Sequence, residues 1–583
     1  PLREPLGEPL GEPLGEPLAH RLRRHLRARN TATAVVALVV AAVSLFVLAR
    51  WAGAFLPRLL AGAPLATLWG DAVVGIGLLA LATGSAAVRD VTLVSIATAF
   101  SAALRLEMLR ALVRQPAAAA RARPDGETLM RVAGDITLLH QSLVRVLALW
   151  APSVVTSAIL LGAIVATTPL LAVATAILIA PMLVAIGRVS GRLTGSVRLA
   201  QDHLATLGGA IGEALSGLRE AKVFRREAAL ERRFAELSDR AVQHMLREER
   251  LAVTHPAVVS FVAVAALLAL VLLAAWWQRR GAIDGASLTQ FLVLLGLLVG
   301  PLQESFRSYS SVVRLRTLYA RCADVLATPH EHDAADALTI DDAPGAVTFA
   351  GVTVRHPSTG FVLGPVELQI AAGETIVLVG PSGSGKSTLL ELVPRLGEPD
   401  DGSVLLDGVA VPRLSLASLR ARCALVPQEP YFFAGSIEEN LTFAAPHVDR
   451  RAVVAACRAA HVEEFVQRLP DGYATTLTRG ASNLSVGQRR RLAMARAMLV
   501  APRILLLDEP TAALDEESEQ LLVDALRVFS EGRTTIIASH APRVLPLAHR
   551  IVRLVHGRVV SIEPGARANA PHVRPHRAVN DAG

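Results

Sequence analysis

A glycine-rich loop just past the middle of the 583-residue chain combines the residue types that bind phosphate groups. It fits the pattern G-x-x-x-x-G-K-[ST], and its residues are Gly380, Pro381, Ser382, Gly383, Ser384, Gly385, Lys386, Ser387 and Thr388. Glycines let backbone N–H groups turn toward an anion, and a helix that follows adds the positive end of its dipole. Lys386 is expected to reach the β- and γ-phosphates of a nucleotide, and the Ser387 hydroxyl is expected to bind Mg²⁺. The loop therefore predicts a nucleotide site.

The use of lysine in this chain supports that prediction. Lys and Arg total 59, but only Lys222 and Lys386 are lysines, so arginine supplies nearly every other positive charge. A compact ammonium group suits a site beside phosphates, whereas a guanidinium group is planar and forked. The one lysine in the C-terminal half therefore stands where phosphate chemistry requires it.

A second candidate for chemistry is a pair of carboxylates at the end of an apolar stretch. Residues 503–507 read Arg-Ile-Leu-Leu-Leu and predict a buried strand, which Asp508 and Glu509 follow. Asp508 is expected to hold Mg²⁺, directly or through water, and Glu509 is expected to orient and deprotonate an attacking water. An apolar run that ends in Asp-Glu is weak evidence alone, but next to a phosphate loop it indicates hydrolysis.

These residues need strands and helices to position them. The apolar run Thr375–Leu378 predicts a buried strand before the loop, and Leu389–Val393 predicts the start of a helix that Pro394 ends. From Val347 onward, short apolar strands alternate with helices. That alternation predicts an α/β domain with a largely parallel sheet.

The N-terminal half has the composition of a membrane protein. Hydrophobic residues make up 52% of the chain and its mean hydropathy is +0.43, both high for a soluble protein. Arg21–Arg29 is a basic cluster before the first apolar stretch, so the positive-inside rule places both the N-terminus and, after six crossings, the C-terminus in the cytoplasm. The stretches long enough to span a bilayer lie at about 31–56, 69–88, 146–168, 170–187, 255–277 and 286–303.

Long and short connections alternate between the predicted spans. Long stretches that are rich in charge and helical in pattern separate spans two and three, and again spans four and five. They predict helices that extend from the membrane into the cytoplasm. The predicted organisation is a disordered repeat tail, a six-helix transmembrane domain with long cytoplasmic extensions, a linker, the α/β domain and a disordered tail, over residues 1–20, 21–327, 328–345, 346–565 and 566–583.

Charge and cysteine content exclude other classes of protein. The formal net charge of +8 would suit nucleic acid, but aromatic residues are only 4% and the basic residues mostly flank apolar stretches. We therefore expect no nucleic acid partner. The cysteines, Cys322, Cys423 and Cys457, lack the spacing of metal ligands or of a disulfide framework and are predicted to be inert packing residues.

Four further motifs follow one another in the C-terminal half. They are Gln428 after Val-Pro, the run Leu484-Ser485-Val486-Gly487-Gln488, Asp515 after Ala-Leu, and His540 after Ala-Ser. With the phosphate loop and the Asp-Glu pair, they resemble the glutamine loop, signature sequence, D-loop and switch histidine of ABC transporter nucleotide-binding domains. In the N-terminal half, residues 125–135 and 213–219 resemble the cytoplasmic loops of exporters whose six spans precede one ATPase domain.

The resemblance implies a multidomain membrane protein: an all-α six-helix transmembrane domain fused to an α/β P-loop NTPase domain of the ABC type. It implies a half-transporter of the exporter type that binds ATP and Mg²⁺ and hydrolyses ATP to switch from an inward-facing to an outward-facing state. The catalytic residues would be Lys386, Gln428, Glu509 and His540, and the Mg²⁺ ligands would be Ser387, Gln428 and Asp508. Gln488 and Asp515 would belong to the ATP site, and Ser485 and Gly487 would contact the γ-phosphate bound to a second subunit.

The resemblance also implies partners, namely a second half-transporter subunit, membrane lipid and a transported substrate. A homodimer in the bacterial cytoplasmic membrane is favoured. The alternatives are one subunit of a heterodimeric exporter, as in bacterial pairs linked to thiol export and cytochrome assembly, and an ATP-gated channel or membrane regulator on the same frame. The predicted spans carry few ionisable residues, which favours an apolar or amphipathic cargo. A drug, a lipid, a peptide and a siderophore all stay open.

Three positions depart from the family pattern. Val486 replaces the first glycine of LSGGQ, and a β-branched residue resists positive φ. The LSVGQ form nevertheless resembles the hydrolysing C-terminal site of the ABC transporter C subfamily, which favours a working site. His356 stands where an aromatic residue, usually tyrosine, stacks on adenine, and imidazole stacks more weakly. Arg479 replaces a glutamate before the signature, which indicates altered coupling, an acidic partner or a neutral surface change.

Overall fold

The computed structural model describes residues 18, 28–121, 130–167, 169, 171–177, 206–281, 283–340, 344–356 and 360–568. The chain divides into two compact units. The first comprises Pro1–Gln115 and Ala119–His330, and the second comprises Pro116–Ala118 and Glu331–Gly583. The two units differ in class, because the described part of the first is helical and the second is α/β.

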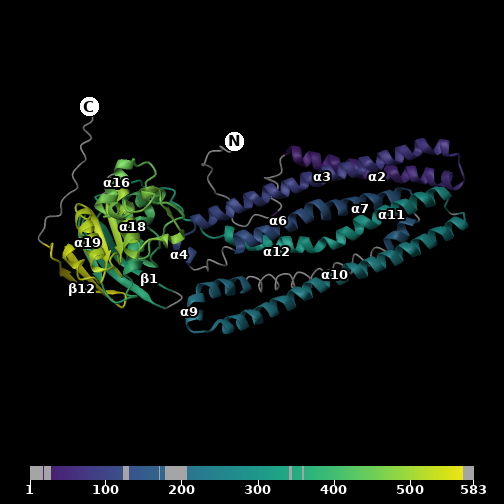
Figure 1. Cartoon of the computed structure of the whole chain (residues 1–583). Coiled ribbons are helices and arrows are strands. Elements are labelled where there is room, and N and C mark those ends of the chain that lie inside the picture. The colour runs from purple at the N-terminus through teal and green to yellow at the C-terminus, as the bar shows by residue number, and fades with distance from the viewer. Residues whose placement is uncertain are drawn as a thin grey trace, which may run out of the picture. The chain divides into compact units, whose positions relative to one another are not determined.

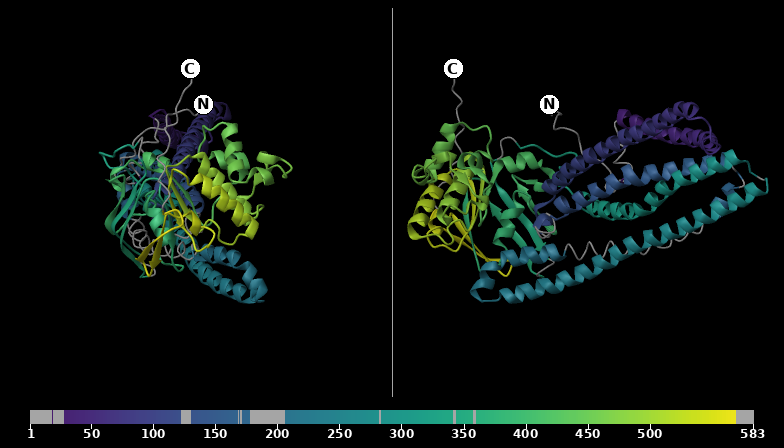
Figure 2. Two further views of the ribbon diagram at one scale, coloured as in Figure 1. Left: turned by 90° about the vertical axis from the view of Figure 1, so that its left-hand side faces the viewer. Right: turned by 45° about the vertical axis from the view of Figure 1, so that its right-hand side comes forward.

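Long helices dominate the first unit, and α3, α10 and α11 run lengthwise through it (Figures 1 and 2). Two wider, π-type segments, Met130–Asp135 and Arg145–Trp150, adjoin α6, so that residues 130–167 are helical without a break. The helices before residue 330 are α2 (Ala28–Leu60), α3 (Leu65–Arg114), α4 (Ala117–Arg121), α6 (Ile136–Val144), α7 (Ala151–Thr167), α9 (Leu218–Val223), α10 (Glu227–Arg279), α11 (Gly285–Arg307) and α12 (Tyr309–Leu326).

Four helical segments within the described residues are long and apolar enough to cross a membrane. They correspond to the first, second, third and sixth predicted stretches and are Arg29–Leu59, Leu68–Arg114, Val132–Thr167 and Gly285–Leu326. The fifth predicted stretch lies in α10, whose last part, Leu268–Arg279, is a shorter apolar helix. The fourth, at 170–187, falls mostly outside the described residues. Helix α3 runs far beyond its apolar stretch, as expected of a helix that extends out of the membrane.

Two hydrophobic clusters hold the helices of the first unit together. One joins α2, α7, α10 and α11 around Phe291, and the other joins α3, α6 and α12 around Phe100. Helices α2 and α3 pack closely because Gly75 has no side chain, and a Cβ there would lie 2.5 Å from the Trp51 ring. Trp51 in turn stacks on Phe55 of the same helix, with ring centroids 4.7 Å apart.

The second unit combines two main sheets with short helices (Figures 1 and 2). A six-stranded sheet has the order β12-β11-β3-β10-β9-β6, in which all strands but β12 run parallel. An antiparallel sheet has the order β2-β1-β4-β5, and β7 pairs with β8. The strands are β1 (Val347–Arg355), β2 (Val362–Ile370), β3 (Thr375–Val379), β4 (Asp401–Leu406), β5 (Val409–Ala410), β6 (Cys423–Val426), β7 (Gly435–Ser436), β8 (Thr476–Leu477), β9 (Ile504–Asp508), β10 (Thr534–Ala538), β11 (Arg550–Val555) and β12 (Arg558–Pro564).

The parallel sheet is buried on both faces, which explains why its strands are continuously apolar. In β3, Ile376 and Leu378 belong to a core shared with α13 and the antiparallel sheet, whereas Val377 belongs to a core shared with α15, α16, α18 and α19. The helices of this unit are α13 (Lys386–Leu392), α14 (Leu416–Arg422), α15 (Ile437–Thr442), α16 (Arg450–Ala459), α17 (Glu463–Val466), α18 (Val486–Leu499) and α19 (Glu516–Phe529). Helix α13 begins earlier than the sequence predicted, at Lys386.

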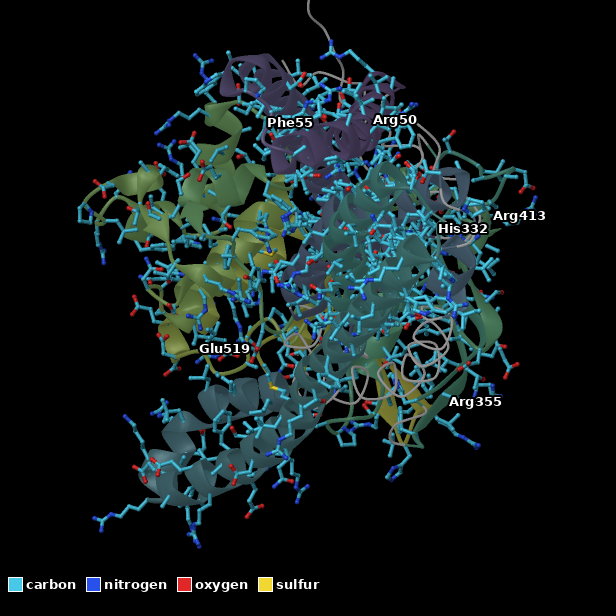
Figure 3. All side chains as sticks on the ribbon, turned by 90° about the vertical axis from the view of Figure 1, so that its right-hand side faces the viewer. Arg50, Phe55, His332, Arg355, Arg413 and Glu519 are labelled. Carbon is cyan, nitrogen blue, oxygen red and sulfur yellow. The ribbon has the colours of Figure 1, made fainter. Side chains whose placement is uncertain are left out.

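Part of the predicted linker is tied to the second unit. Glu331 accepts two hydrogen bonds from the Arg420 guanidinium, at 2.6 and 2.9 Å. The N–H of Leu338 donates to the carbonyl oxygen of Arg413 at 2.8 Å. Figure 3 labels Arg413 and the linker residue His332. Residues 331–338 therefore behave as part of the α/β unit.

Little of either predicted tail lies within the described residues. Of residues 1–20 only Leu18 is described, and it packs against the cluster around Phe100. The C-terminal tail is described as far as Ala568. Both tail predictions stay predictions.

Candidate functional site

The phosphate loop connects the carboxyl end of β3 to α13, at the edge where parallel α/β sheets bind ligands. Glycine is required at two of its positions. A Cβ at Gly380 would lie 1.9 Å from the carbonyl oxygen of Leu554 on β11. Gly385 has a φ of +97°, and a Cβ there would lie 2.6 Å from the Leu363 side chain on β2. A residue with a side chain would not fit at Gly380 or Gly385, because the loop backbone lies directly against both sheets.

The loop forms one wall of a cavity of about 480 Å³. Gln428 after β6, Glu509 after β9, and His356 and Phe361 between β1 and β2 form the other walls. The sequence analysis did not identify Phe361. In the structure its ring centroid lies 6.0 Å from that of His356. The full lining is His356, Phe361, Ser382, Gly383, Ser384, Gly385, Lys386, Ser387, Thr388, Gln428 and Glu509.

Lys386 is only 5% exposed at the start of α13. Its Nζ donates to the carbonyl oxygens of Gly380 at 2.7 Å and Pro381 at 3.2 Å, and lies 3.0 Å from His540 Nε2. An ammonium group has three hydrogens, so these contacts satisfy it if His540 accepts at Nε2 as the neutral tautomer. Burial lowers the pKa of Lys386, and nearby carboxylates, Glu509 foremost, raise it.

Glu509 faces the loop across the cavity. Its backbone has a φ of +44°, and its N–H donates to the carbonyl oxygen of Ala538 at 2.8 Å. The Glu509 carboxylate lies 3.5 Å from Gln428 Nε2 through one oxygen and 3.7 Å from His540 Nε2 through the other. Three residues that the sequence predicted to be catalytic therefore meet around one carboxylate.

Asp508 ends β9 with a buried Oδ1 that has no hydrogen-bond partner among the described residues. Burial raises the pKa of Asp508, and a hydrogen bond with Ser387 lowers it. A carboxylate oxygen in need of a partner, next to a hydroxyl group, is a donor set that suits a hard cation. In the part of the chain that the structure describes, no cluster of three or more His, Cys, Asp and Glu side chains forms a metal site by itself.

The signature residues lie elsewhere in the domain. The Ser485 hydroxyl accepts from the Gln488 N–H at 3.1 Å and the Gln488 side chain accepts from the Ser485 N–H at 2.9 Å, which caps α18. Asp515 caps α19, and hydrogen bonds from the Ser518 side chain and backbone lower the pKa of Asp515. Gly487 packs on Ser518, where a Cβ would lie 2.9 Å from the hydroxyl oxygen. Among the described residues, none of these four site residues lines the cavity.

The three departures from the family pattern have different settings. Val486 is the first residue of α18 and 40% exposed, so its β-branched side chain sits on helical backbone and needs no positive φ. His356 lines the cavity, with Nε2 3.5 Å from the Thr388 hydroxyl. Arg479 is exposed at the start of a short 3₁₀ turn.

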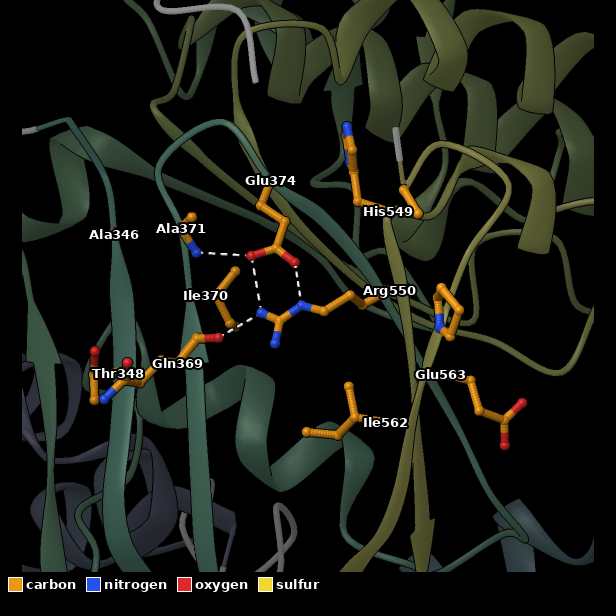
Figure 4. A pocket seen from close by; sticks show the side chains of 12 residues that line it. Ala346, Thr348, Gln369, Ile370, Ala371, Glu374, His549, Arg550, Ile562 and Glu563 are labelled. Atoms are coloured by element: carbon orange, nitrogen blue, oxygen red, sulfur yellow. Dashed lines mark hydrogen bonds and ion pairs between the residues drawn. The ribbon is translucent and has the colours of Figure 1, made fainter. Parts of the chain in front are cut away.

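A second cavity, of about 740 Å³, lies at the amino ends of β3 and β11 (Figure 4). Glu374 is 3% exposed there, and its carboxylate accepts from Arg550 at 2.5 and 2.9 Å and from the Ala371 N–H at 2.8 Å. These bonds satisfy the buried carboxylate and tie the β2–β3 turn to β11. None of the predicted site residues lines this cavity.

Known proteins resemble both units. Residues 30–302 match the ABC transporter transmembrane region, and residues 363–512 match the ABC transporter family. The ATP-dependent lipid A-core flippase of Thiobacillus denitrificans is 33% identical over 470 residues, which cover 80% of each chain. A multidrug efflux ATP-binding/permease protein of Mycobacterium bovis is 30% identical over 79% of this chain and 38% of its own length. The solved structure of a bacterial Atm1-family ABC exporter with ATP bound shares the fold, with a TM-score of 0.83 at 22% identity over 92% of this chain and 95% of that one.

These matches place a membrane region ahead of a single ATP-binding domain, in the order that the sequence motifs predicted. The predicted combination of a helical membrane domain and an α/β ATPase domain is confirmed. The chain therefore belongs to the ABC transporter family, as a half-transporter of the exporter type that couples ATP hydrolysis to transport.

Proposed function

We propose that this half-transporter works as a dimer and exports an amphipathic molecule, with lipid as the first class to test. The observation that carries the proposal is the division of the ATP-site residues. The phosphate loop, Gln428 and Glu509 share one cavity, whereas Ser485 and Gly487 lie outside it. A complete site therefore needs the signature sequence of a second subunit. Similarity to a lipid A-core flippase and to a multidrug efflux protein supports a lipid or another amphipathic cargo.

Each composite site would use residues of both subunits to hold ATP. Lys386 and the loop N–H groups bind the β- and γ-phosphates, while His356 and Phe361 form a two-ring wall for the base. Ser485 and Gly487 of the second subunit, at the start of α18, close over the γ-phosphate. Gln488 and Asp515 support that surface through the caps of α18 and α19.

Hydrolysis would depend on the residues that end β6 and β9. Ser387, Gln428 and Asp508 are the residues that would hold Mg²⁺, which offsets the charge that develops on the phosphates. Glu509 lies within reach of both Gln428 and His540, a position from which it can orient and deprotonate a water molecule. His540 would report the presence of the γ-phosphate, because it already contacts the lysine that binds it.

The N-terminal half of α10 supports a contact between subunits. This half is rich in charge, yet it exposes apolar side chains: Phe234, Val242, Met245 and Leu246. Exposed apolar patches on a surface that faces water mark protein contacts. We assign this surface to the second subunit.

Both termini are proposed to lie in the cytoplasm of a bacterium. The basic cluster Arg21–Arg29 precedes the first span, which favours a cytoplasmic N-terminus. An ATPase domain must also meet cytoplasmic ATP, so the membrane would be the cytoplasmic membrane.

The test uses the full chain in lipid vesicles, with wild type compared with Glu509→Gln. ATP-dependent movement of a fluorescent phospholipid between leaflets and ATP turnover are measured together. We expect both activities in wild type and neither in the variant, which still binds ATP. Equal, slow turnover by the two proteins would overturn the catalytic assignment. Turnover that a panel of lipids leaves unchanged, but that amphipathic drugs stimulate, would overturn lipid as the cargo.

A further inference from the structure

Helix α18 carries four arginines after the signature sequence, and each donates to a backbone carbonyl oxygen of a different residue. Arg489 binds Leu484, Arg490 binds Gln428, Arg491 binds His461 and Arg496 binds Tyr431, at 2.8, 3.5, 2.9 and 3.0 Å. Two of these four acceptors, Gln428 and Tyr431, belong to the segment that follows β6 and forms the glutamine loop. One helix thus joins the signature to that loop.

Arg490 is the most buried of the four arginines. It is 7% exposed, and its Nη1 is buried without a hydrogen-bond partner among the described residues. Burial lowers the pKa of Arg490, and the carboxylates of Glu509 and Glu429 oppose that shift. A buried charge without a close ion pair is costly, and an apolar side chain of similar length would fill the same space at no such cost. Packing alone therefore does not account for an arginine here.

Gln428 links Arg490 to the hydrolytic carboxylate. The carbonyl oxygen of Gln428 accepts from Arg490 Nη2 at 3.5 Å, and the side chain of the same residue lies 3.5 Å from Glu509 Oε2. A shift of α18 along its axis would therefore move Gln428 relative to Glu509. Arg490 stands one turn after Gly487, so a shift of the signature is also a shift of Arg490.

We propose that Arg490 is a positioning residue that couples the signature sequence to the Gln428–Glu509 pair of the same chain. The proposal rests on the composite ATP site proposed above, in which this signature contacts the nucleotide of the second subunit. Engagement of that nucleotide would draw α18 toward it and, through Arg490, set Gln428 and Glu509 in this chain's own site. The two ATP sites of the dimer would then hydrolyse cooperatively.

The decisive variant is Arg490→Met, which keeps the length of the side chain but removes its charge and donors. Replacement of a buried charge by an apolar group of similar volume is commonly neutral or stabilising, so we expect an unchanged or higher melting temperature. In vesicles we expect kcat for ATP to fall about tenfold or more, since small misplacements near a reacting centre have effects of that order. The KM for ATP should stay within about twofold, because Arg490 lines no part of the nucleotide cavity. The Hill coefficient for ATP should fall toward one.

Arg491→Met is the matched control. Arg491 is the next residue of the same helix and also has a buried donor, Nε, without a partner in the described part of the chain, but it binds the carbonyl of His461. Its loss should leave the Hill coefficient and kcat unchanged. Arg490→Lys restores the charge and should recover part of the lost kcat.

The outcomes separate this inference from the proposed function. If wild type is monomeric, or hydrolyses ATP no faster than Glu509→Gln, the proposed function fails first. If wild type is a cooperative dimer and Arg490→Met retains its kcat and Hill coefficient, the role of Arg490 is overturned. Should Arg490→Met fail to fold, Arg490→Lys decides: a folded lysine variant with a kcat and a Hill coefficient below those of wild type supports the role of Arg490, and one that matches wild type in both overturns it.

Discussion

Lys386 has three polar atoms around its ammonium group, and none of them carries a full negative charge. Two are backbone carbonyl oxygens and the third is His540 Nε2. Exchange of one of them for a phosphate oxygen gives a charge-assisted hydrogen bond, which is stronger. Asp508 has the opposite need. Its buried Oδ1 has no hydrogen-bond donor among the described residues, and a cation or a water molecule would supply the missing partner. Both side chains thus favour the arrival of a nucleotide with a divalent metal.

Lys386→Ala should weaken ATP binding by about 10- to 100-fold, the range that loss of one or two hydrogen bonds to charged groups produces. The chain provides its own control in Lys222, the other lysine, which is exposed on α9 in the first unit. Lys222→Ala should bind ATP as wild type does. Fluorescent ATP titrated into the two detergent-solubilised variants measures both affinities. A similar loss in both variants would contradict the assignment of Lys386.

Mg²⁺-dependent ATP binding should weaken as the pH falls. Asp508 must be ionised to hold the metal, and its pKa is raised by burial, so protons compete with Mg²⁺ at a higher pH than they would at an exposed aspartate. Mg²⁺ titrations of Glu509→Gln with fluorescent ATP, in buffers from neutral to mildly acidic, measure this dependence. Binding of metal-free ATP over the same range is the control. A Mg²⁺ affinity that does not change with pH would remove Asp508 from the metal site.

Helix caps show how elements, rather than single residues, prepare the site. Ser485 and Gln488 form a capping box on α18, and Ser436 and Glu439 form the same arrangement on α15. The two boxes have the same local role. Only the capping box of α18 belongs to the signature sequence. Variants of the two boxes can therefore distinguish an effect on helix stability from an effect on nucleotide chemistry.

Ser485→Ala and Ser436→Ala should each destabilise the ATPase domain by about 1 kcal/mol, the usual effect of losing a cap. Only Ser485→Ala should also abolish most ATP turnover, because its hydroxyl is proposed to meet the γ-phosphate of the second subunit. Thermal unfolding and ATPase assays on both proteins test this. If turnover falls equally in the two variants, Ser485 acts only as a cap.

Elements with strong local signals could be predicted from the sequence, and contacts between distant elements could not. The strand Thr375–Val379 was predictable because burial on both faces makes it uniformly apolar. The antiparallel sheet was not, because register shifts in the β1–β2 and β1–β4 pairs interrupt the alternation that marks a half-buried strand. Phe361 was missed because no motif marks it, and the contact of Lys386 with His540 joins residues 154 positions apart. Site roles carried over from the family resemblance stay predictions.

At the scale of the whole molecule, the family's motifs lie on separate surfaces of the α/β unit. The phosphate loop opens into a cavity, and the signature sequence starts a helix outside it. Val486 and Ser382 are both exposed on the described surface of the α/β unit. In a dimer with composite sites, these two residues of opposite subunits would approach each other across ATP.

Cysteines introduced together at Ser382 and Val486 should link two chains covalently when ATP is bound and hydrolysis is blocked by Glu509→Gln. The native cysteines, Cys322, Cys423 and Cys457, are buried and form no disulfide within the described residues, so they should not react. Denaturing gels after mild oxidation should show a dimer that each single-cysteine variant lacks. Monomers alone, with ATP binding intact, would contradict composite sites between subunits.

Because the chain has only two lysines, amine-reactive labelling can report on each of them separately. Apart from the terminal amine, only Lys222 and Lys386 can be acylated by amine-reactive reagents, and the first is exposed while the second is buried among backbone carbonyls. Acylation of Lys222 would count the total protein, and acylation of Lys386 would count only chains whose phosphate loop has opened and freed the ammonium group. The ratio of the two, read by mass spectrometry on membranes from intact cells, would report how often that loop opens, without any added label.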